Sequence, residues 1–162
     1  MDYHPISLCN VLYKIIAKSL ANRLKHHLRD YIDPAQQAFI EGRRISDNII
    51  IAHEIARSFS LKSWKHVAFM LKIDLAKAFD RLEWNFIVSA LAGKGLHGHF
   101  VNLVHVCISS PSFSVLINGQ PSPKFKSFRG IRQGCPMSPY LFVLAINELS
   151  ILLNEDLQAK QL

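Results

Sequence analysis

The stretch "MLKIDLAKAFDRLEW", residues 70–84, places Asp74 and Asp80 six residues apart at the end of an apolar run. We expect a buried strand over residues 67–73, because polar residues bound this short, nearly continuous apolar segment. Asp74 then lies at the C-terminal end of the strand, where its carboxylate can bind Mg²⁺ through hard oxygen atoms. Enzymes with two metal ions use such carboxylates in phosphoryl transfer. On the spacing alone, two solvated aspartates beside a helix start are the preferred interpretation, because two aspartates six residues apart are common.

A second group of polar residues lies in "RGIRQGCPMSP", residues 129–139. Glycines allow close approach of a backbone to a ligand, arginines can bind phosphate, and a glutamine amide both donates and accepts hydrogen bonds. The residues concerned are Gly130, Gly134, Arg129, Arg132 and Gln133. The Ser138-Pro139 pair predicts a helix start whose free amide groups suit anions. A capped turn without a ligand is the alternative, because the segment matches neither common glycine-rich phosphate motif.

Hydrophobic spacing predicts the elements that position these residues. We expect helices over residues 10–29, from Ser46 or Asp47 to Ser60, over 83–92, over 98–109, and from Ser138 to about 154. "SFSVLIN" and "KFKSF" predict a β-hairpin within residues 112–128, with a loop of more than two residues around Asn118-Gly119. The buried faces expected for the first, second and third helices are Val11, Leu12, Ile15, Ile16, Leu20, Leu24 and Leu28; Ile49, Ile50, Ile55 and Phe59; and Phe86, Ile87, Ala90 and Leu91. This mixture of helices and antiparallel strands indicates an α+β fold.

Composition limits the class of protein. The 162 residues suit one domain or part of a larger one, and 49% hydrophobic residues indicate a globular chain. A net charge of +7 favours a polyanionic partner, nucleic acid before an anionic membrane. The three cysteines, Cys9, Cys107 and Cys135, are too few and too far apart for a zinc site or a disulfide framework, so we expect reduced thiols. No apolar run is long enough to span a bilayer.

Five stretches in order resemble the reverse transcriptase of LINE-type, non-LTR retrotransposons, especially the plant elements. They are "HPISLCNVLYKIIAKSLANRLK", "QQAFIEGRRISDNIIIAHE", "LKIDLAKAFDRLEWNFI", "SVLINGQP" and "RGIRQGCPMSPYLFVLAINELS". The resemblance implies one incomplete reverse transcriptase domain of a right-hand polymerase: a fingers-like region over residues 1–66 and a partial palm over 67–162, with helices packed on a small antiparallel sheet. It also implies an RNA template, a DNA primer and dNTP as partners, nuclear localisation and no membrane.

The resemblance assigns roles to individual residues. Asp74 is similar to the first catalytic aspartate of the palm and is expected to bind Mg²⁺, two ions in the complete enzyme, with help from the carbonyl of Leu75. Phe79 stands at the position of the steric gate, where an aromatic ring excludes a ribose 2′-OH. Asp80 is expected to be structural.

Further residues are expected to bind the nucleotide or the template. The backbone amides near Lys77 and Ala78 would face the triphosphate, Gln133 would lie over the incoming nucleotide, and Gly134 would leave room for the template. Lys14 is a candidate cation for the triphosphate, and Arg43 could help to hold the template backbone.

Two departures from the family pattern matter. His4 stands where the family usually has an arginine, which weakens a phosphate contact. The family's aromatic-Ala-Asp-Asp block, thumb and endonuclease are absent from the 162 residues, so we expect Asp74 alone to hold Mg²⁺ poorly and the fragment to be inactive by itself. Three hypotheses remain: part of an RNA-directed DNA polymerase, an inactive remnant that only binds nucleic acid, and a fragment with no activity of its own.

Overall fold

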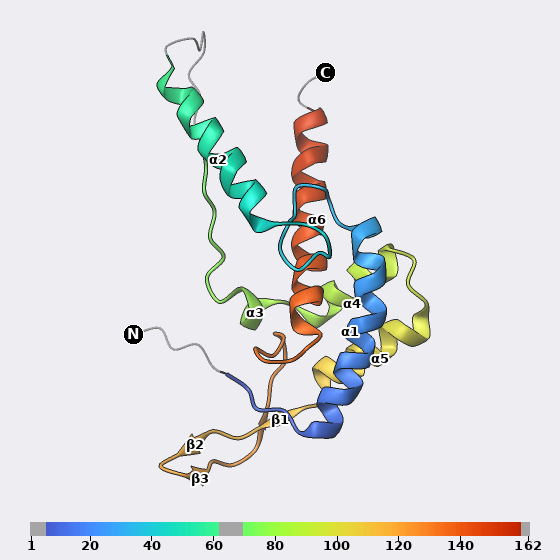
Figure 1. Cartoon of the computed structure of the whole chain (residues 1–162). Coiled ribbons are helices and arrows are strands. Elements are labelled where there is room, and N and C mark those ends of the chain that lie inside the picture. Colours follow the sequence, from blue (N-terminus) through green and yellow to red (C-terminus); the bar gives the residue numbers. More distant parts are fainter. Residues whose placement is uncertain (1–5, 62–69, 160–162) are drawn as a thin grey trace.

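The computed structural model describes residues 6–61 and 70–159. It contains helices α1 (Val11–Tyr31), α2 (Ile45–Ser60), α3 (Ala78–Arg81), α4 (Trp84–Gly93), α5 (Gly98–Ser109) and α6 (Ser138–Ala159), with four two-residue strands between α5 and α6 (Figure 1). The strands are β1 (Ser112–Phe113), β2 (Leu116–Ile117), β3 (Gln120–Pro121) and β4 (Phe125–Lys126). The predicted α+β class is confirmed.

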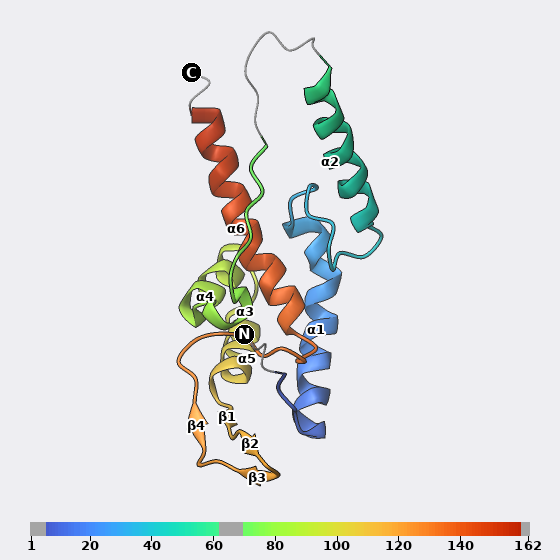
Figure 2. The same ribbon diagram turned by 90° about the vertical axis from the view of Figure 1, so that its left-hand side faces the viewer.

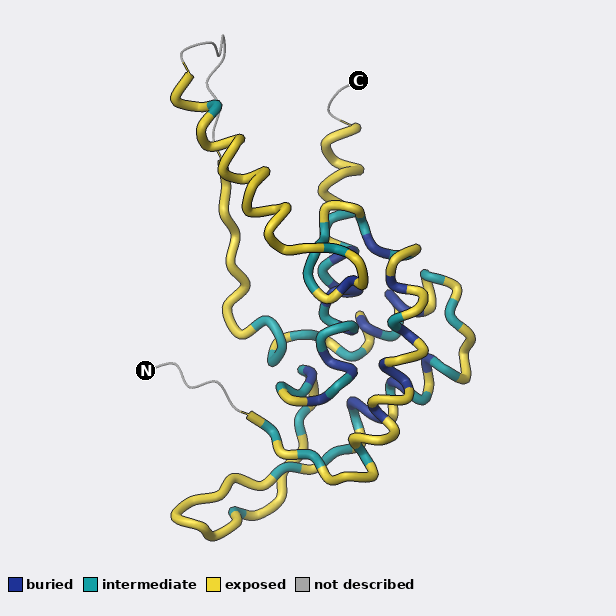
Figure 3. Tube along the Cα trace, in the orientation of Figure 1, coloured by how far each residue is buried: buried dark blue, intermediate teal, exposed yellow. Residues whose placement is uncertain are grey.

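The hydrophobic core is built by helices α1, α4, α5 and α6, which pack on one another (Figure 3). Its largest fully buried side chains are Leu24, Leu28, Ile87, Leu91, Met137, Leu141, Leu144, Val104 and Val143. No strand residue belongs to this cluster in the described part of the chain. The core is therefore helix on helix, and the small antiparallel pairs lie beside it rather than beneath the helices.

Helix α1 turns a different stripe to the core from the one predicted. Leu20, Leu24 and Leu28 are buried as expected, and the small residues Ala17 and Ala21 join them. The prediction was wrong for the first turns, where four apolar side chains are exposed: Val11, Leu12, Ile15 and Ile16. The reason is that Ala17 and Ala21 are small and lie three or four residues from the leucines. Together they form a side of α1 on which another helix can pack closely.

Helix α2 stands away from α4 and α5 in both views (Figures 1 and 2). The prediction that Ile49, Ile50, Ile55 and Phe59 point inward was wrong, because all four are exposed and α2 has no buried residue. Periodicity correctly predicted the helix, since an apolar stripe is a local property. It could not tell whether the described part of the chain supplies a surface to cover that stripe.

The strand predicted over residues 67–73 is not present in its described part, residues 70–73, and residues 67–69 lie outside the described ranges. Residues 70–75 form an irregular segment that leads into α3 (Figure 1). Met70, Leu71 and Ile73 are exposed. A strand needs a partner for its backbone N–H and C=O groups, and none of the described strands pairs with this segment.

The hairpin forms as predicted, but its loop has two residues. Ile117 pairs with Gln120, so Asn118 and Gly119 alone make the turn, with φ values of 49° and 80°. Positive φ at both positions matches the two-residue turn that Asn-Gly favours. The expectation of a longer loop was wrong, because the residues after Gly119 pair although they are not apolar.

The hairpin is interrupted once. β1 pairs with β4 through Phe113 and Phe125, whereas β2 pairs with β3 in a register shifted by one residue. In the interval, the Ser122 hydroxyl accepts a hydrogen bond from the Val115 amide at 3.0 Å. This bulge bends the outer part of the hairpin away from the core. No helix in the described ranges is long and apolar enough to cross a membrane.

Candidate functional site

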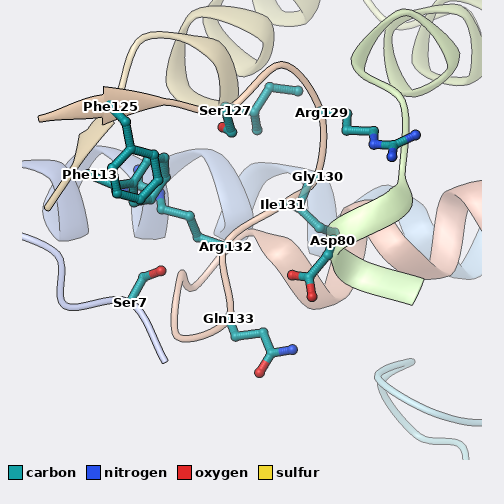
Figure 4. Close-up of a pocket in the computed structure, with 11 residues that line it drawn as sticks. Ser7, Asp80, Phe113, Phe125, Ser127, Arg129, Gly130, Ile131, Arg132 and Gln133 are labelled. Atoms are coloured by element: carbon teal, nitrogen blue, oxygen red, sulfur yellow. The ribbon is translucent and has the colours of Figure 1, made fainter. Parts of the chain in front are cut away.

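Two cavities share Gln133 of the loop that joins β4 to α6. The first, of about 330 Å³, is called here the arginine cavity and is lined by Ser7, Asp80, Ile108, Phe113, Phe125, Ser127, Arg129, Gly130, Ile131, Arg132 and Gln133 (Figure 4). The second, of about 460 Å³, is called the glutamine hollow and is lined by Phe79, Gln133, Gly134, Cys135, Pro136, Ser138 and Pro139. The glutamine hollow therefore brings together Phe79, Gln133 and Gly134, three residues that the family resemblance assigns to one nucleotide site.

Backbone hydrogen bonds fix Phe79 beside the loop. The amide of Ile131 donates to the carbonyl of Phe79 at 2.8 Å, and the amide of Gly130 donates to the carbonyl of Leu82 at 2.7 Å. The indole Nε1 of Trp84 donates to the carbonyl of Gly130 at 2.7 Å. These three bonds hold α3, the start of α4 and the loop in one arrangement, although the loop is far from both helices in the sequence.

The two glycines serve close contacts within the chain itself. A Cβ on Gly130, whose φ is +86°, would lie 2.8 Å from the backbone oxygen of Asp80. A Cβ on Gly134 would lie 3.2 Å from the backbone oxygen of Ser7, whose amide donates to the carbonyl of Gln133 at 3.2 Å. The prediction that these glycines leave room for a ligand or a template stays a prediction. The described backbone that approaches them belongs to α3 and to the segment before α1.

The start of α6 does not offer the free amides that the Ser-Pro pair predicted. The amide of Ser138 donates to the carbonyl of Cys135, and the amides of Tyr140 and Leu141 both donate to the carbonyl of Met137. Ser138 is buried. This end of α6 is thus satisfied by the preceding turn, and the prediction of an anion site there was wrong.

Phe79 is half-buried and stacks on Phe142 of α6, with ring centroids 4.8 Å apart and an angle of 20° between the ring planes. The stack and the backbone bond to Ile131 restrict the ring to one place at the edge of the glutamine hollow. Just before it, Lys77 adopts a left-handed conformation with φ of 52° and is exposed, while Ala78 is half-buried. The left-handed residue turns the chain sharply into α3.

Asp74 and Leu75 are exposed on the irregular segment before α3. Asp74 is not among the residues that line either cavity, whereas Asp80 lines the arginine cavity. Within residues 6–61 and 70–159, no group of three or more histidine, cysteine, aspartate or glutamate side chains could hold a metal ion. The exposed carboxylate of Asp74 has the right chemistry for one Mg²⁺ ion, but the described residues do not make a two-ion centre.

Arg132 packs against Tyr13 of α1. Its guanidinium carbon lies 3.7 Å from the centroid of the Tyr13 ring and 5.9 Å from that of Phe113. In Figure 4 its side chain runs from the loop toward the rings of Phe113 and Phe125. The Tyr13 hydroxyl lies 3.2 Å from the Cys107 carbonyl, to which it donates, and burial raises the pKa of this phenol well above its usual range. A cation over a partly buried ring joins the loop to α1.

Arg43 is occupied by contacts within the chain. Its Nη1 donates to the carbonyls of Asp33 and Gln36 at 2.7 and 2.6 Å, and its Nη2 donates to those of Ile32 and Arg29 at 3.1 and 3.4 Å. The guanidinium therefore organises the turn after α1, and a template contact through these nitrogens requires breaking these bonds. Lys14 lies exposed on α1 and lines neither cavity.

Sequence reasoning missed the residues that support the loop, which are Trp84, Tyr13 and Ser7. A tryptophan near a helix start carries a weak signal, because a partly buried indole N–H needs an acceptor. Ser7 carries no sequence signal, since it acts through its backbone.

The thiols are free, as predicted, with Cys107 and Cys135 buried.

Comparison with known proteins gives one family. The model of the family described as "Reverse transcriptase (RNA-dependent DNA polymerase)" matches residues 1–161. The chain is 33% identical over 156 residues to the "Transposon TX1 uncharacterized 149 kDa protein" of Xenopus laevis. The aligned region covers 96% of this chain and 12% of that protein.

Two insect relatives agree. The "Retrovirus-related Pol polyprotein from type-2 retrotransposable element R2DM" of Drosophila melanogaster is 32% identical over 161 residues, covering 98% of this chain and 15% of its own length. The "Retrovirus-related Pol polyprotein from type-1 retrotransposable element R2" of Popillia japonica is 26% identical over 151 residues, covering 91% and 20%. The chain thus spans at most a fifth of the length of these relatives.

Proposed function

Because the chain belongs to the reverse transcriptase (RNA-dependent DNA polymerase) family, we propose that it supplies the nucleotide-binding part of a polymerase that copies RNA into DNA. In that reaction the oxygen of a primer 3′-OH attacks the α-phosphorus of a dNTP, the bond to the β-phosphate breaks, and pyrophosphate leaves. The observation that carries the proposal is the glutamine hollow, in which Phe79, Gln133 and Gly134 share one cavity.

Each residue of the hollow has a physical role in this proposal. The Phe79 ring, held by its stack on Phe142, excludes a ribose 2′-OH by steric clash. The Gln133 amide contacts the incoming nucleotide, and Gly134 leaves space for the template base beside it. The amides near Lys77 and Ala78, and the ammonium of Lys14, contact the triphosphate. We propose that Arg43 contacts the template backbone when the turn after α1 opens and releases its guanidinium.

Mg²⁺ is the metal that this function requires. Asp74 and the carbonyl of Leu75 are the proposed ligands, with water and phosphate oxygens completing the shell. When bound, the metal neutralises negative charge on the phosphates. In the complete polymerase two ions are proposed, with further carboxylates outside the 162 residues.

We place such a polymerase in a non-LTR retrotransposon acting in the nucleus. A plant-type element rests on the sequence resemblance alone, since the relatives above come from a frog and insects.

The nucleotide site is tested by binding of fluorescent dTTP and UTP analogues to the 162-residue chain in the presence of Mg²⁺. We expect the deoxynucleotide to bind more tightly, and Phe79→Ala to narrow the difference. Phe128→Ala is the matched control, because the Phe128 ring is 91% exposed and lines neither cavity. Equal binding of the two nucleotides, or an unchanged preference in Phe79→Ala, would contradict the proposed gate.

A second candidate function is an inactive remnant that only binds nucleic acid. It is favoured because Asp74 lines neither cavity and because the described ranges hold no group of three potential metal ligands. A primer-extension assay decides between the two. Mg²⁺-dependent extension that is lost in Asp74→Asn supports the enzyme, whereas filter binding of template-primer without extension supports the remnant.

A further inference from the structure

A third cavity lies on α1 beside the connection between α4 and α5. It has a volume of about 480 Å³ and is lined by Arg23, Leu24, His26, His27, Tyr31, Gly95, Leu96, His97 and Phe100. None of these residues lines the arginine cavity or the glutamine hollow. We call it the histidine cavity. It is separate from every residue to which the polymerase reaction assigns a role.

The charge of the histidine cavity has one sign. Arg23 brings a permanent cation, three imidazoles surround the same space, and no carboxylate belongs to the lining. Lys25 and Lys94 are sequence neighbours of lining residues, and they are paired with Glu41 at 3.2 Å and Glu148 at 2.9 Å. The cavity therefore favours a ligand with negative charge.

Flat rings line the same space. The His27 ring stacks on Tyr31, with centroids 6.1 Å apart and an interplanar angle of 28°. Phe100 and Tyr31 are half-buried, so their positions are fixed by packing against the core, whereas Arg23 and His27 are exposed to solvent. An anion that also carries a flat aromatic group fits both features, and single-stranded nucleic acid has this chemistry because its phosphates alternate with bases.

His97 has a separate role at the rim. It is the N-cap of α5, and its Nδ1 accepts a hydrogen bond from the amide of His99 at 3.2 Å. Because His97 also lines the cavity, this hydrogen bond restricts the orientation of one residue at the rim. The rim is thus partly ordered before any ligand arrives, which lowers the entropic cost of binding.

We propose that the histidine cavity binds a nucleotide unit of single-stranded RNA or DNA, at a place distinct from the polymerase site. The base lies on the aromatic rings and the phosphate contacts Arg23 and the imidazoles. The proposal depends on the proposed function only for the class of ligand. Such a site holds a strand where it passes between α1 and the connection from α4 to α5.

The test uses fluorescence anisotropy of labelled decauridine with the 162-residue chain and the double variant Arg23→Gln/His27→Ala. Stacking and phosphate contacts of this kind predict a roughly tenfold weaker affinity. The control is Lys18→Gln/His99→Ala, which removes one cation and one imidazole from exposed positions that do not line the cavity. We expect less than a twofold change in the control. Equal weakening in both variants would overturn the proposal in favour of diffuse charge.

Photo-crosslinking with 5-bromouridine decamers gives a second readout that does not depend on affinity. We expect adducts at Tyr31 or Phe100. Adducts confined to the loop of Gln133 would overturn the second site and leave the polymerase proposal standing. A chain that binds no decauridine also overturns it, while the dTTP and UTP experiment still decides the polymerase site. Binding of decathymidine, compared with that of decauridine, separates DNA from RNA as the ligand. Displacement of decauridine by polyglutamate of equal charge would reject nucleic acid as the specific ligand.

Discussion

Replacing Arg43 tests whether this residue stabilises the turn after α1 or contacts nucleic acid. Its two terminal nitrogens make four hydrogen bonds to backbone carbonyls, three of them at 3.1 Å or shorter. We count these three at about 1 kcal/mol each, because the side chain is only partly buried and water replaces some of the loss. Arg43→Met should therefore lower the free energy of unfolding by about 3 kcal/mol.

The assay is thermal unfolding followed by circular dichroism. For a chain of this size, a loss of about 3 kcal/mol corresponds to a fall in Tm of about 6–12 °C. The Tm of Arg43→Lys should fall roughly half as far, because an ammonium cannot reach four carbonyls arranged around a planar group. Arg44→Met is the matched control, since Arg44 is the exposed neighbour with the same charge and caps α2 without a side-chain hydrogen bond.

A Tm for Arg43→Met within about 2 °C of that of the Arg44→Met control would refute the stabilising role of Arg43. A variant with unchanged Tm but much weaker binding to template-primer would instead establish the nucleic-acid contact that the sequence resemblance implied. The two roles predict opposite patterns, so one pair of measurements separates them.

Three other predictions concern the loop, α6 and the thiols. Gly130→Ala should lower the unfolding free energy by at least about 2 kcal/mol more than Gly42→Ala does. Both glycines have positive φ, but only at Gly130 would the new Cβ meet backbone atoms, so equal losses would contradict the close contact. Asn147→Leu should cost about 1–3 kcal/mol, because the buried amide of Asn147 bonds one backbone amide and one carbonyl near the end of α1, and a chemical denaturation midpoint equal to wild type would reject this. With a thiol reagent at pH 8, Cys9 should react first; burial raises the pKa of Cys107, so rapid labelling of that residue would show that the core opens.

The hydrophobic pattern predicted the helices well because helix formation is decided locally. α1, α2, α4, α5 and α6 were all expected, with ends that differ from the observed ones by a few residues. Asn118-Gly119 predicted a turn for the same reason, since positive φ is a property of those two residues. The family resemblance placed Phe79 and Gln133 in one nucleotide site; the two residues line the glutamine hollow, and their contact with a nucleotide stays a prediction.

Only the tertiary structure decided which apolar faces are covered and what each polar group contacts. The stripe of α2 and the first turns of α1 look like core in the sequence but are exposed, because burial depends on what packs against a helix. The family resemblance assigns Arg43 to the template backbone, yet its guanidinium binds the carbonyls of Asp33 and Ile32 in the turn after α1. Residue type and spacing determined the chemistry available to this chain, whereas long-range packing determined which groups remain free to use it.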